Sequence, residues 1–137
     1  MKRDPRAEAE RWLIQARDEF DDAEALRRRK RYYLALFHFQ QATEKALKAF
    51  LYWQSAAEEV FFTHSVHELI QGAAEFWPGF GELRRAARLD QYYIPTRYPN
   101  GLPGGVPSRF YTDPAEAREA MHLARMVLEA VEERFAA

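Results

Sequence analysis

The sequence lacks cysteine altogether, and its 137 residues contain no long apolar run. Without cysteine, disulfides, thiolate catalysis and cysteine-based zinc sites are all excluded. The longest stretch without a charged residue, 32–43, has 12 residues, whereas a membrane-spanning helix needs about 18 or more. The first residues are charged and form no apolar signal segment. We therefore expect a cytoplasmic protein that has no contact with membranes.

The sequence also lacks an excess of charge of either sign. Lys and Arg together number 20 and Asp and Glu 21, so the net charge is near -1. Any affinity for nucleic acid must therefore come from a local cluster of cations. Hydrophobic residues make up 47% of the chain and aromatic residues 15%, which argues against disorder. The length is typical of one domain, which we expect to span residues 1–137.

Standard catalytic and phosphate-binding motifs are absent as well. The sequence contains neither G-x-x-x-x-G-K-[ST] nor G-x-G-x-x-G. Only three serines are present, and none lies in a nucleophile-elbow context. A Ser-His-Asp hydrolase is therefore not expected.

Turn-forming residues are concentrated in one segment, and good helix formers dominate elsewhere. Residues 95–107 hold four of the seven prolines and three of the six glycines, so we expect a loop over 93–112. Apolar residues at helical spacing predict helices over 6–29 and 32–53, a helix that follows a capping Ser65, and a shorter one over 81–92. Asp113 as N-cap and Pro114 at the first position predict a last helix that runs to the C-terminus. The predicted fold is all-α, an up-and-down bundle of four to five helices with a long Pro/Gly-rich loop before the last helix.

The helix predicted over 32–53 has a broad apolar face and a mixed second face. Gln41, Lys45 and Lys48 form a polar stripe on the second face, next to aromatic side chains. The loop adds Arg97 and Tyr98, which are residues of the same types. Cations beside aromatic rings suit the phosphate and the base of a nucleotide. The same stripe equally suits a dimer interface.

Two other groups of residues are candidates for chemistry. His64 and His67 have the spacing of metal ligands on a helix, but no third ligand is evident, so we predict no metal site. Arg118 and His122 lie one turn apart on the last predicted helix. An arginine that holds a phosphate and a histidine that moves a proton can cleave RNA without metal. The alternative is an ordinary solvated charged face.

The motifs along the chain resemble those of HEPN domains (higher eukaryotes and prokaryotes nucleotide-binding). Residues 33–49, YLALFHFQQATEKALKA, resemble the second helix of these domains, and Gln-Gln-x-x-Glu-Lys-x-x-Lys is the most specific part. Trp12 in an acidic first helix, HSVHEL at 64–69 and Thr-Arg-Tyr-Pro at 96–99 fit in the same order. The resemblance covers about residues 8–135.

The resemblance implies a helical bundle, usually a dimer, and a function that involves nucleotides. Many members of the family are encoded beside a minimal nucleotidyltransferase, and such pairs often act as toxin and antitoxin. Other members are metal-independent RNases that use Arg, four to six spacer residues and His. Arg118 and His122 have only three spacers, so the chain looks more like the branch without this motif.

The family's motif positions imply a set of nucleotide-binding residues: Gln41, Glu44, Lys45, Lys48, His67, Arg97 and Tyr98. The favoured hypothesis is therefore a nucleotide-binding or interaction module without a cofactor, whose partner is a minimal nucleotidyltransferase. A metal-independent RNase that uses Arg118 and His122 is one alternative, with RNA as its partner. A purely structural homodimeric bundle is the other.

Overall fold

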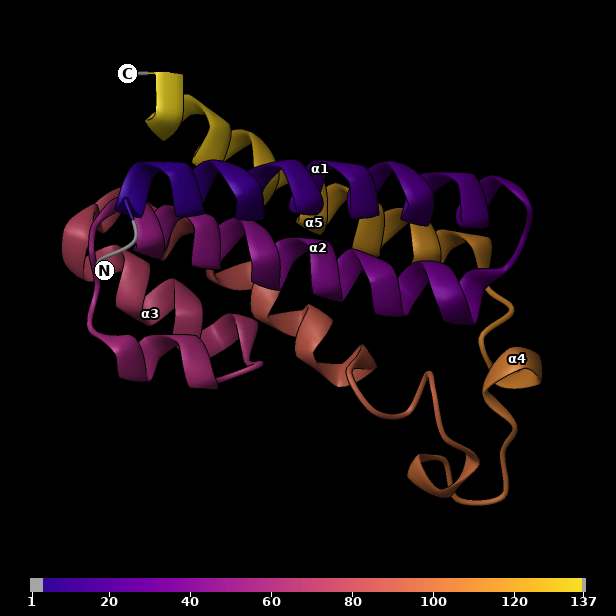
Figure 1. Ribbon diagram of the computed structural model, residues 1–137. Coiled ribbons are helices and arrows are strands. Elements are labelled where there is room, and N and C mark those ends of the chain that lie inside the picture. The colour runs from indigo at the N-terminus through magenta and orange to yellow at the C-terminus, as the bar shows by residue number, and fades with distance from the viewer. Residues whose placement is uncertain (1–3, 137) are drawn as a thin grey trace.

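The computed structural model describes residues 4–136, and within them every regular element is helical (Figure 1). In chain order the elements are α1 (Pro5–Arg28), α2 (Tyr32–Trp53), η1 (Glu58–Phe62), α3 (Val66–Phe76), η2 (Pro78–Tyr92), η3 (Pro99–Gly101), α4 (Pro107–Phe110) and α5 (Pro114–Ala136). The η elements are 3₁₀ helices. The all-α bundle predicted from the sequence is thus confirmed. None of the helices in residues 4–136 combines the length and the apolar character that a membrane span requires.

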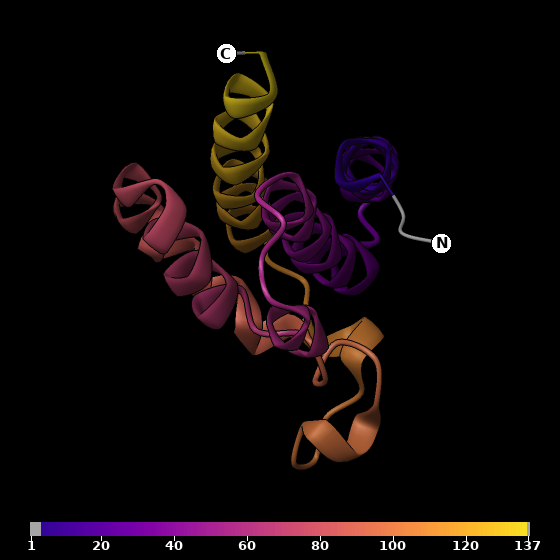
Figure 2. The ribbon, with the colours of Figure 1, turned by 60° about the vertical axis from the view of Figure 1, so that its left-hand side comes forward.

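Helix α2 is the central element of the bundle. It packs against α1 as an antiparallel hairpin and against α5 on another side, while α1 and α5 contact each other much less (Figures 1 and 2). Helix α3 and the long 3₁₀ segment η2 pair with each other and cover a further side of α2. Because neighbours surround it on several sides, α2 buries polar as well as apolar side chains.

The helix ends follow from local capping chemistry. Helix α2 has the predicted bounds, and α1 begins one residue earlier than predicted because the Asp4 carboxylate accepts the backbone N–H of Arg6 at 3.0 Å. The hydroxyl of Ser65 accepts the N–H of Glu68 at 3.2 Å, and Asp113 accepts that of Ala115 at 2.9 Å. Each interaction satisfies an N–H that the helix itself leaves unpaired.

Three details of the secondary structure differ from the prediction. A 3₁₀ turn at 58–62 was not predicted, and the segment predicted to be helical over 81–92 begins at Pro78 and is a 3₁₀ helix. The Pro/Gly-rich segment was predicted to exclude helix, yet η3 and α4 are short helical turns within and beside it. Pro99 and Pro107 are the first residues of these turns, where proline is tolerated because the N–H it lacks would have no partner.

Residues 93–113, here called the arm, extend away from the bundle between η2 and α5 (Figure 2). The buried side chains of Thr96, Pro107 and Tyr111 anchor the arm. Four of its large hydrophobic side chains are exposed by about half or more: Ile94, Tyr98, Val106 and Phe110. The arm therefore combines a fixed base with an apolar outer surface.

Candidate functional site

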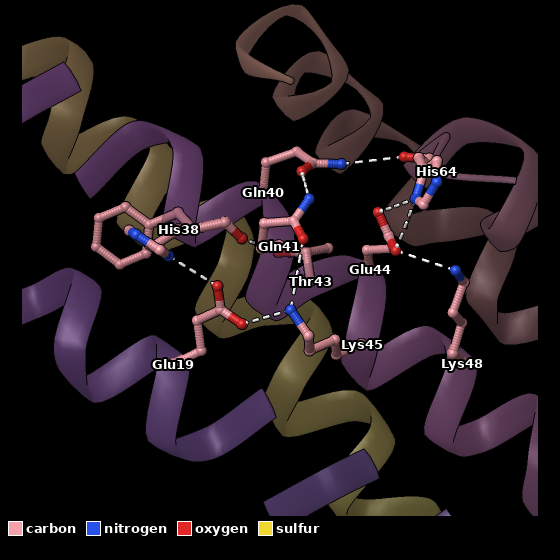
Figure 3. A network of polar contacts seen from close by, with 10 residues as sticks. Glu19, His38, Gln40, Gln41, Thr43, Glu44, Lys45, Lys48 and His64 are labelled. Atoms are coloured by element: carbon pink, nitrogen blue, oxygen red, sulfur yellow. Dashed lines mark hydrogen bonds and ion pairs between the residues drawn. The ribbon is translucent and has the colours of Figure 1, made fainter. Parts of the chain in front are cut away.

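Polar side chains of α2 form a continuous network that reaches α1 on one side and the segment before α3 on the other (Figure 3). At the first end, Glu19 of α1 binds two residues of α2. Its carboxylate lies 2.8 Å from His38 Nδ1 and 2.6 Å from Lys45 Nζ. Burial raises the pKa of Glu19, but the hydrogen bonds from His38 and Lys45 outweigh burial and lower that pKa below its usual value. Glu19 is therefore ionised at neutral pH.

Two neighbouring glutamines carry the network across α2. Lys45 Nζ donates to Gln41 Oε1 at 3.4 Å, and Gln41 Nε2 donates to Gln40 Oε1 at 2.7 Å. Gln40 is fully buried, and its Nε2 donates to the backbone carbonyl of His64 at 3.0 Å. This last contact fixes the segment before α3 against α2.

Glu44 and Lys48 form a buried ion pair at the second end of the network. Lys48 Nζ lies 3.0 Å from Glu44 Oε2, and the two residues are only 3% and 4% exposed. His64 Nδ1 lies 3.2 Å from the same oxygen (Figure 3). Lys48 was predicted as part of the polar stripe of this helix, and the structure places it beside Trp12 of α1, with its ammonium 5.8 Å from the ring centre. Glu44 lies beside His64.

A cation surrounded by aromatic rings lies beside this network, at the base of the arm. The Arg97 guanidinium carbon lies 4.7 Å from the ring centres of Phe37 and Tyr93 and 5.1 Å from that of Tyr98. Arg97 Nε donates to the Tyr93 carbonyl at 2.7 Å. Arg97 itself is exposed, and its two Nη groups have no partner among residues 4–136. These four residues are called the Arg97 cluster below.

The Arg97 cluster adjoins the α2 network at two points. Phe37 lies one helical turn before Gln41 on α2. On the other side, the Tyr93 ring stacks on the His64 ring with centres 5.1 Å apart and planes 16° apart. The cluster and the network therefore form one surface with aromatic, cationic and hydrogen-bonding groups.

The structure brings together some of the residues that the resemblance implied and separates others. Gln41 and Lys45 are half-buried at the edge of this surface, while Arg97 and Tyr98 are exposed on it. Glu44 and Lys48 lie beneath it and support His64. The remaining member, His67, has an exposed side chain, and its backbone N–H binds the Asp90 carboxylate at 3.0 Å.

Four network residues were missed as members of this site: Glu19, His38, Gln40 and His64. Glu19 and His38 lie on different helices, and no sequence spacing indicates their contact. His64 was considered only as a metal ligand together with His67. Among residues 4–136, no group of three or more His, Asp or Glu side chains has the arrangement of a metal site.

Arg118 and His122 lie apart from this surface, on α5. Both side chains are exposed, and neither makes a hydrogen bond, ion pair or ring contact within residues 4–136. A catalytic histidine is normally oriented by a second group. No such group holds His122, in contrast to His64.

The basic run 27–31 has a structural role at the end of α1. Arg27 and Arg28 pair with Glu24 at 2.6 and 3.7 Å. The Lys30 and Arg31 N–H groups bond to the carbonyls of Arg27 and Leu26, with Lys30 at a φ of 62°. This arrangement is a helix C-cap, in which cations also interact favourably with the helix dipole.

Comparisons with known proteins agree with this architecture. The family model described as HEPN domain matches residues 9–134. The structure of TT1696 from Thermus thermophilus is similar at 39% identity, with a TM-score of 0.82, over 91% of this chain and 96% of that one. ST0689, an archaeal HEPN homologue, is similar at 30% identity, with a TM-score of 0.74, over 98% of each chain. No curated protein matches the sequence.

The buried ion pair predicts a large effect of Lys48→Met on stability. The substitution leaves the buried Glu44 carboxyl without its nearest cation, and we expect it to lower the free energy of unfolding by about 3 kcal/mol. Lys45→Met is the matched control, since the Lys45 side chain is 23% exposed and we expect a loss of about 1 kcal/mol. Urea denaturation followed by circular dichroism measures both. The double variant Glu44→Gln/Lys48→Met recovers most of the loss, and equal losses from the two lysine variants would contradict this account.

The exposed, unsupported position of His122 predicts that it performs no RNA cleavage. We expect the purified chain to release no more RNA fragments in EDTA than His122→Ala and Arg118→Ala do. A labelled RNA ladder resolved on a denaturing gel provides the measurement. Cleavage by the wild-type chain that both variants abolish would establish a metal-independent RNase on α5.

Proposed function

The chain belongs to the HEPN domain family, and on that premise we propose that it is a nucleotide-binding module. We place the binding surface at the Arg97 cluster and the adjoining side of α2. The module acts together with a minimal nucleotidyltransferase, in a toxin–antitoxin-like pair. The observation that carries the nucleotide proposal is the exposed Arg97 guanidinium, which three aromatic rings hold in place.

The Arg97 cluster has the two kinds of group that a nucleotide requires. The Nε contact to the Tyr93 carbonyl fixes the plane of the guanidinium, and the Nη groups remain for phosphate oxygens. The Tyr98 ring is 51% exposed and offers a face on which a base can stack. Lys45 adds positive charge nearby, although Glu19 balances part of it.

A cavity elsewhere in the molecule does not suit a nucleotide. It has a volume of about 720 Å³, lies where the start of α1 meets the end of α2, and extends to η1. Among residues 4–136, its lining contains two carboxylates, Glu8 and Glu58, and neither lysine nor arginine. The Arg97 cluster offers a phosphate an exposed guanidinium, which the described lining of this cavity does not, so the Arg97 cluster is the better nucleotide site.

The arm supports the proposed contact with another protein. Its exposed apolar side chains, Ile94, Val106 and Phe110, lie on a projecting segment that Pro107 and Tyr111 anchor. Apolar surface of this kind marks protein interaction sites. The same surface suits a second copy of the chain, so a homodimer that uses the arm is the second candidate.

Removal of the Arg97 guanidinium should weaken nucleotide binding without loss of the fold. We expect Arg97→Ala to reduce the affinity for ATP at least tenfold, because a charge-assisted contact to phosphate is lost. Isothermal titration calorimetry with ATP, ADP and AMP measures the effect. Arg109→Ala is the control, since Arg109 is an exposed arginine of the same arm without a side-chain partner among residues 4–136. No binding to the wild-type chain, or equal binding to both variants, would overturn the nucleotide proposal.

A charge placed on the arm should disrupt the protein contact. We expect Phe110→Asp to abolish co-purification with a nucleotidyltransferase encoded beside this chain, because Phe110 is 60% exposed and its burial would drive association. Phe76→Asp on α3 is the control, as this ring is 45% exposed and lies outside the arm. Light scattering of the chain alone distinguishes the homodimer from the complex with another protein. If the wild-type chain is a dimer and Phe110→Asp is a monomer, the arm is a homodimer interface.

A further inference from the structure

His64 presents one ring nitrogen to solvent in a fixed direction. Its Nδ1 binds Glu44, its backbone carbonyl accepts from Gln40, and its ring stacks on Tyr93. Lys48 in turn holds Glu44 in place. The His64 side chain is nevertheless 54% exposed, and its Nε2 has no partner among residues 4–136. A side chain held this firmly, with one polar atom left over, is preorganised for a ligand.

The chemistry of Glu44 determines what Nε2 offers. The Lys48 ammonium forms an ion pair with Glu44 at 3.0 Å, and a carboxylate in an ion pair only accepts hydrogen bonds. His64 Nδ1 must therefore carry the hydrogen. In a neutral imidazole the other nitrogen then has a free lone pair, so Nε2 accepts a hydrogen bond. It suits a hydroxyl group and not a phosphate oxygen, which has no proton to donate.

His64 is also close enough to Arg97, the proposed phosphate-binding residue, for one nucleotide to contact both. The Arg97 guanidinium carbon lies 4.7 Å and the His64 ring centre 5.1 Å from the same Tyr93 ring centre. Both groups are thus within the length of one nucleotide. A shallow pocket of about 310 Å³, lined by Thr63, His64, Ser65, Asp90 and Tyr93, leaves room beside the imidazole.

Three other side chains of this pocket, Thr63, Ser65 and Asp90, already have partners. Thr63 Oγ1 accepts the Ser65 N–H at 3.0 Å. The Asp90 carboxylate accepts the N–H groups of Val66 and His67 and the Ser65 hydroxyl. Among residues 4–136, two groups of this lining have no partner, the Tyr93 hydroxyl and His64 Nε2, and of these His64 Nε2 belongs to the ring that Glu44 holds in place.

From this arrangement we infer that the site takes ribonucleotides and discriminates against their deoxy analogues, with His64 Nε2 accepting a hydrogen bond from a ribose hydroxyl. The inference rests on the proposed function, since it requires a nucleotide phosphate at Arg97. The ribose is the group directly attached to that phosphate, and its hydroxyl is a donor whichever base is present. His64 is thus a specificity-determining residue, and Glu44 positions it.

Calorimetric titration at about pH 8, where histidine is ordinarily neutral, tests the inference. The ligands are ATP, 2′-deoxyATP, 3′-deoxyATP and inosine triphosphate. We expect the wild-type chain to bind at least one deoxy analogue about tenfold more weakly than ATP. His64→Phe keeps a ring that can stack on Tyr93. We expect this variant to bind ATP as weakly as the wild-type chain binds that analogue, and to bind ATP and the analogue with equal affinity.

A matched control and the wild-type data keep the test decisive. Gln91→Leu removes an exposed amide that donates to the Arg88 carbonyl and has no other side-chain hydrogen bond within residues 4–136, and it should retain the discrimination. Equal affinity of the wild-type chain for ATP and both deoxy analogues overturns the inference, and this comparison requires no variant to fold. Weaker binding of inosine triphosphate alone overturns it too, because it assigns His64 to a base amino group. Absence of any nucleotide binding instead refutes the proposed function.

Discussion

The buried pair of Glu44 and Lys48 is the interaction on which the rest of the site depends. Taking two charges out of water is costly, and their mutual attraction offsets that cost only when further hydrogen bonds complete the arrangement. His64 supplies one of these bonds to Glu44, and the Trp12 ring lies 5.8 Å from the Lys48 ammonium. The pair can exist because α2 is covered by α1 on one side and by the segment before α3 on another. One ion pair thus links the packing of α2 to the orientation of an exposed histidine.

The central position of α2 also explains which features of the structure could be predicted from the sequence and which could not. Capping residues act within a few positions along the chain, so the roles of Ser65 and Asp113 were predictable. The bounds of α2, whose N-cap Arg31 makes no side-chain hydrogen bond, were predictable from the spacing of apolar residues. Helical periodicity separates an apolar from a polar face, but it assumes that the polar face meets water. Glu44 and Lys48 violate that assumption, because they are buried where Trp12 of α1 and His64 before α3 lie against α2. The contacts from Glu19 to His38 and Lys45 span 19 and 26 residues, and no local pattern encodes them.

The Arg97 cluster illustrates a further limit of prediction from the sequence. Its arginine and both of its tyrosines belong to the arm, whereas Phe37 belongs to α2. The sequence indicated that both segments have cations and aromatic rings, but only the fold shows that Arg97 lies over Phe37. The geometry joins a rigid helix to an irregular segment, as is common where loops carry function on a fixed scaffold. Tyr93 has a double role there, since its carbonyl orients Arg97 and its ring supports His64.

Charge balance then favours a small ligand over a long polyanion at this surface. Lys45 and Lys48 are each paired with a glutamate within 3.0 Å, so their charge is largely neutralised. Arg97 has no carboxylate partner among residues 4–136, only aromatic rings and a carbonyl. Binding to a nucleic acid backbone gains strength from many unpaired cations along a groove. This surface instead has one group for each part of a single nucleotide. The free Arg97 guanidinium suits the phosphate, the exposed Tyr98 ring suits the base, and His64 Nε2 suits the sugar.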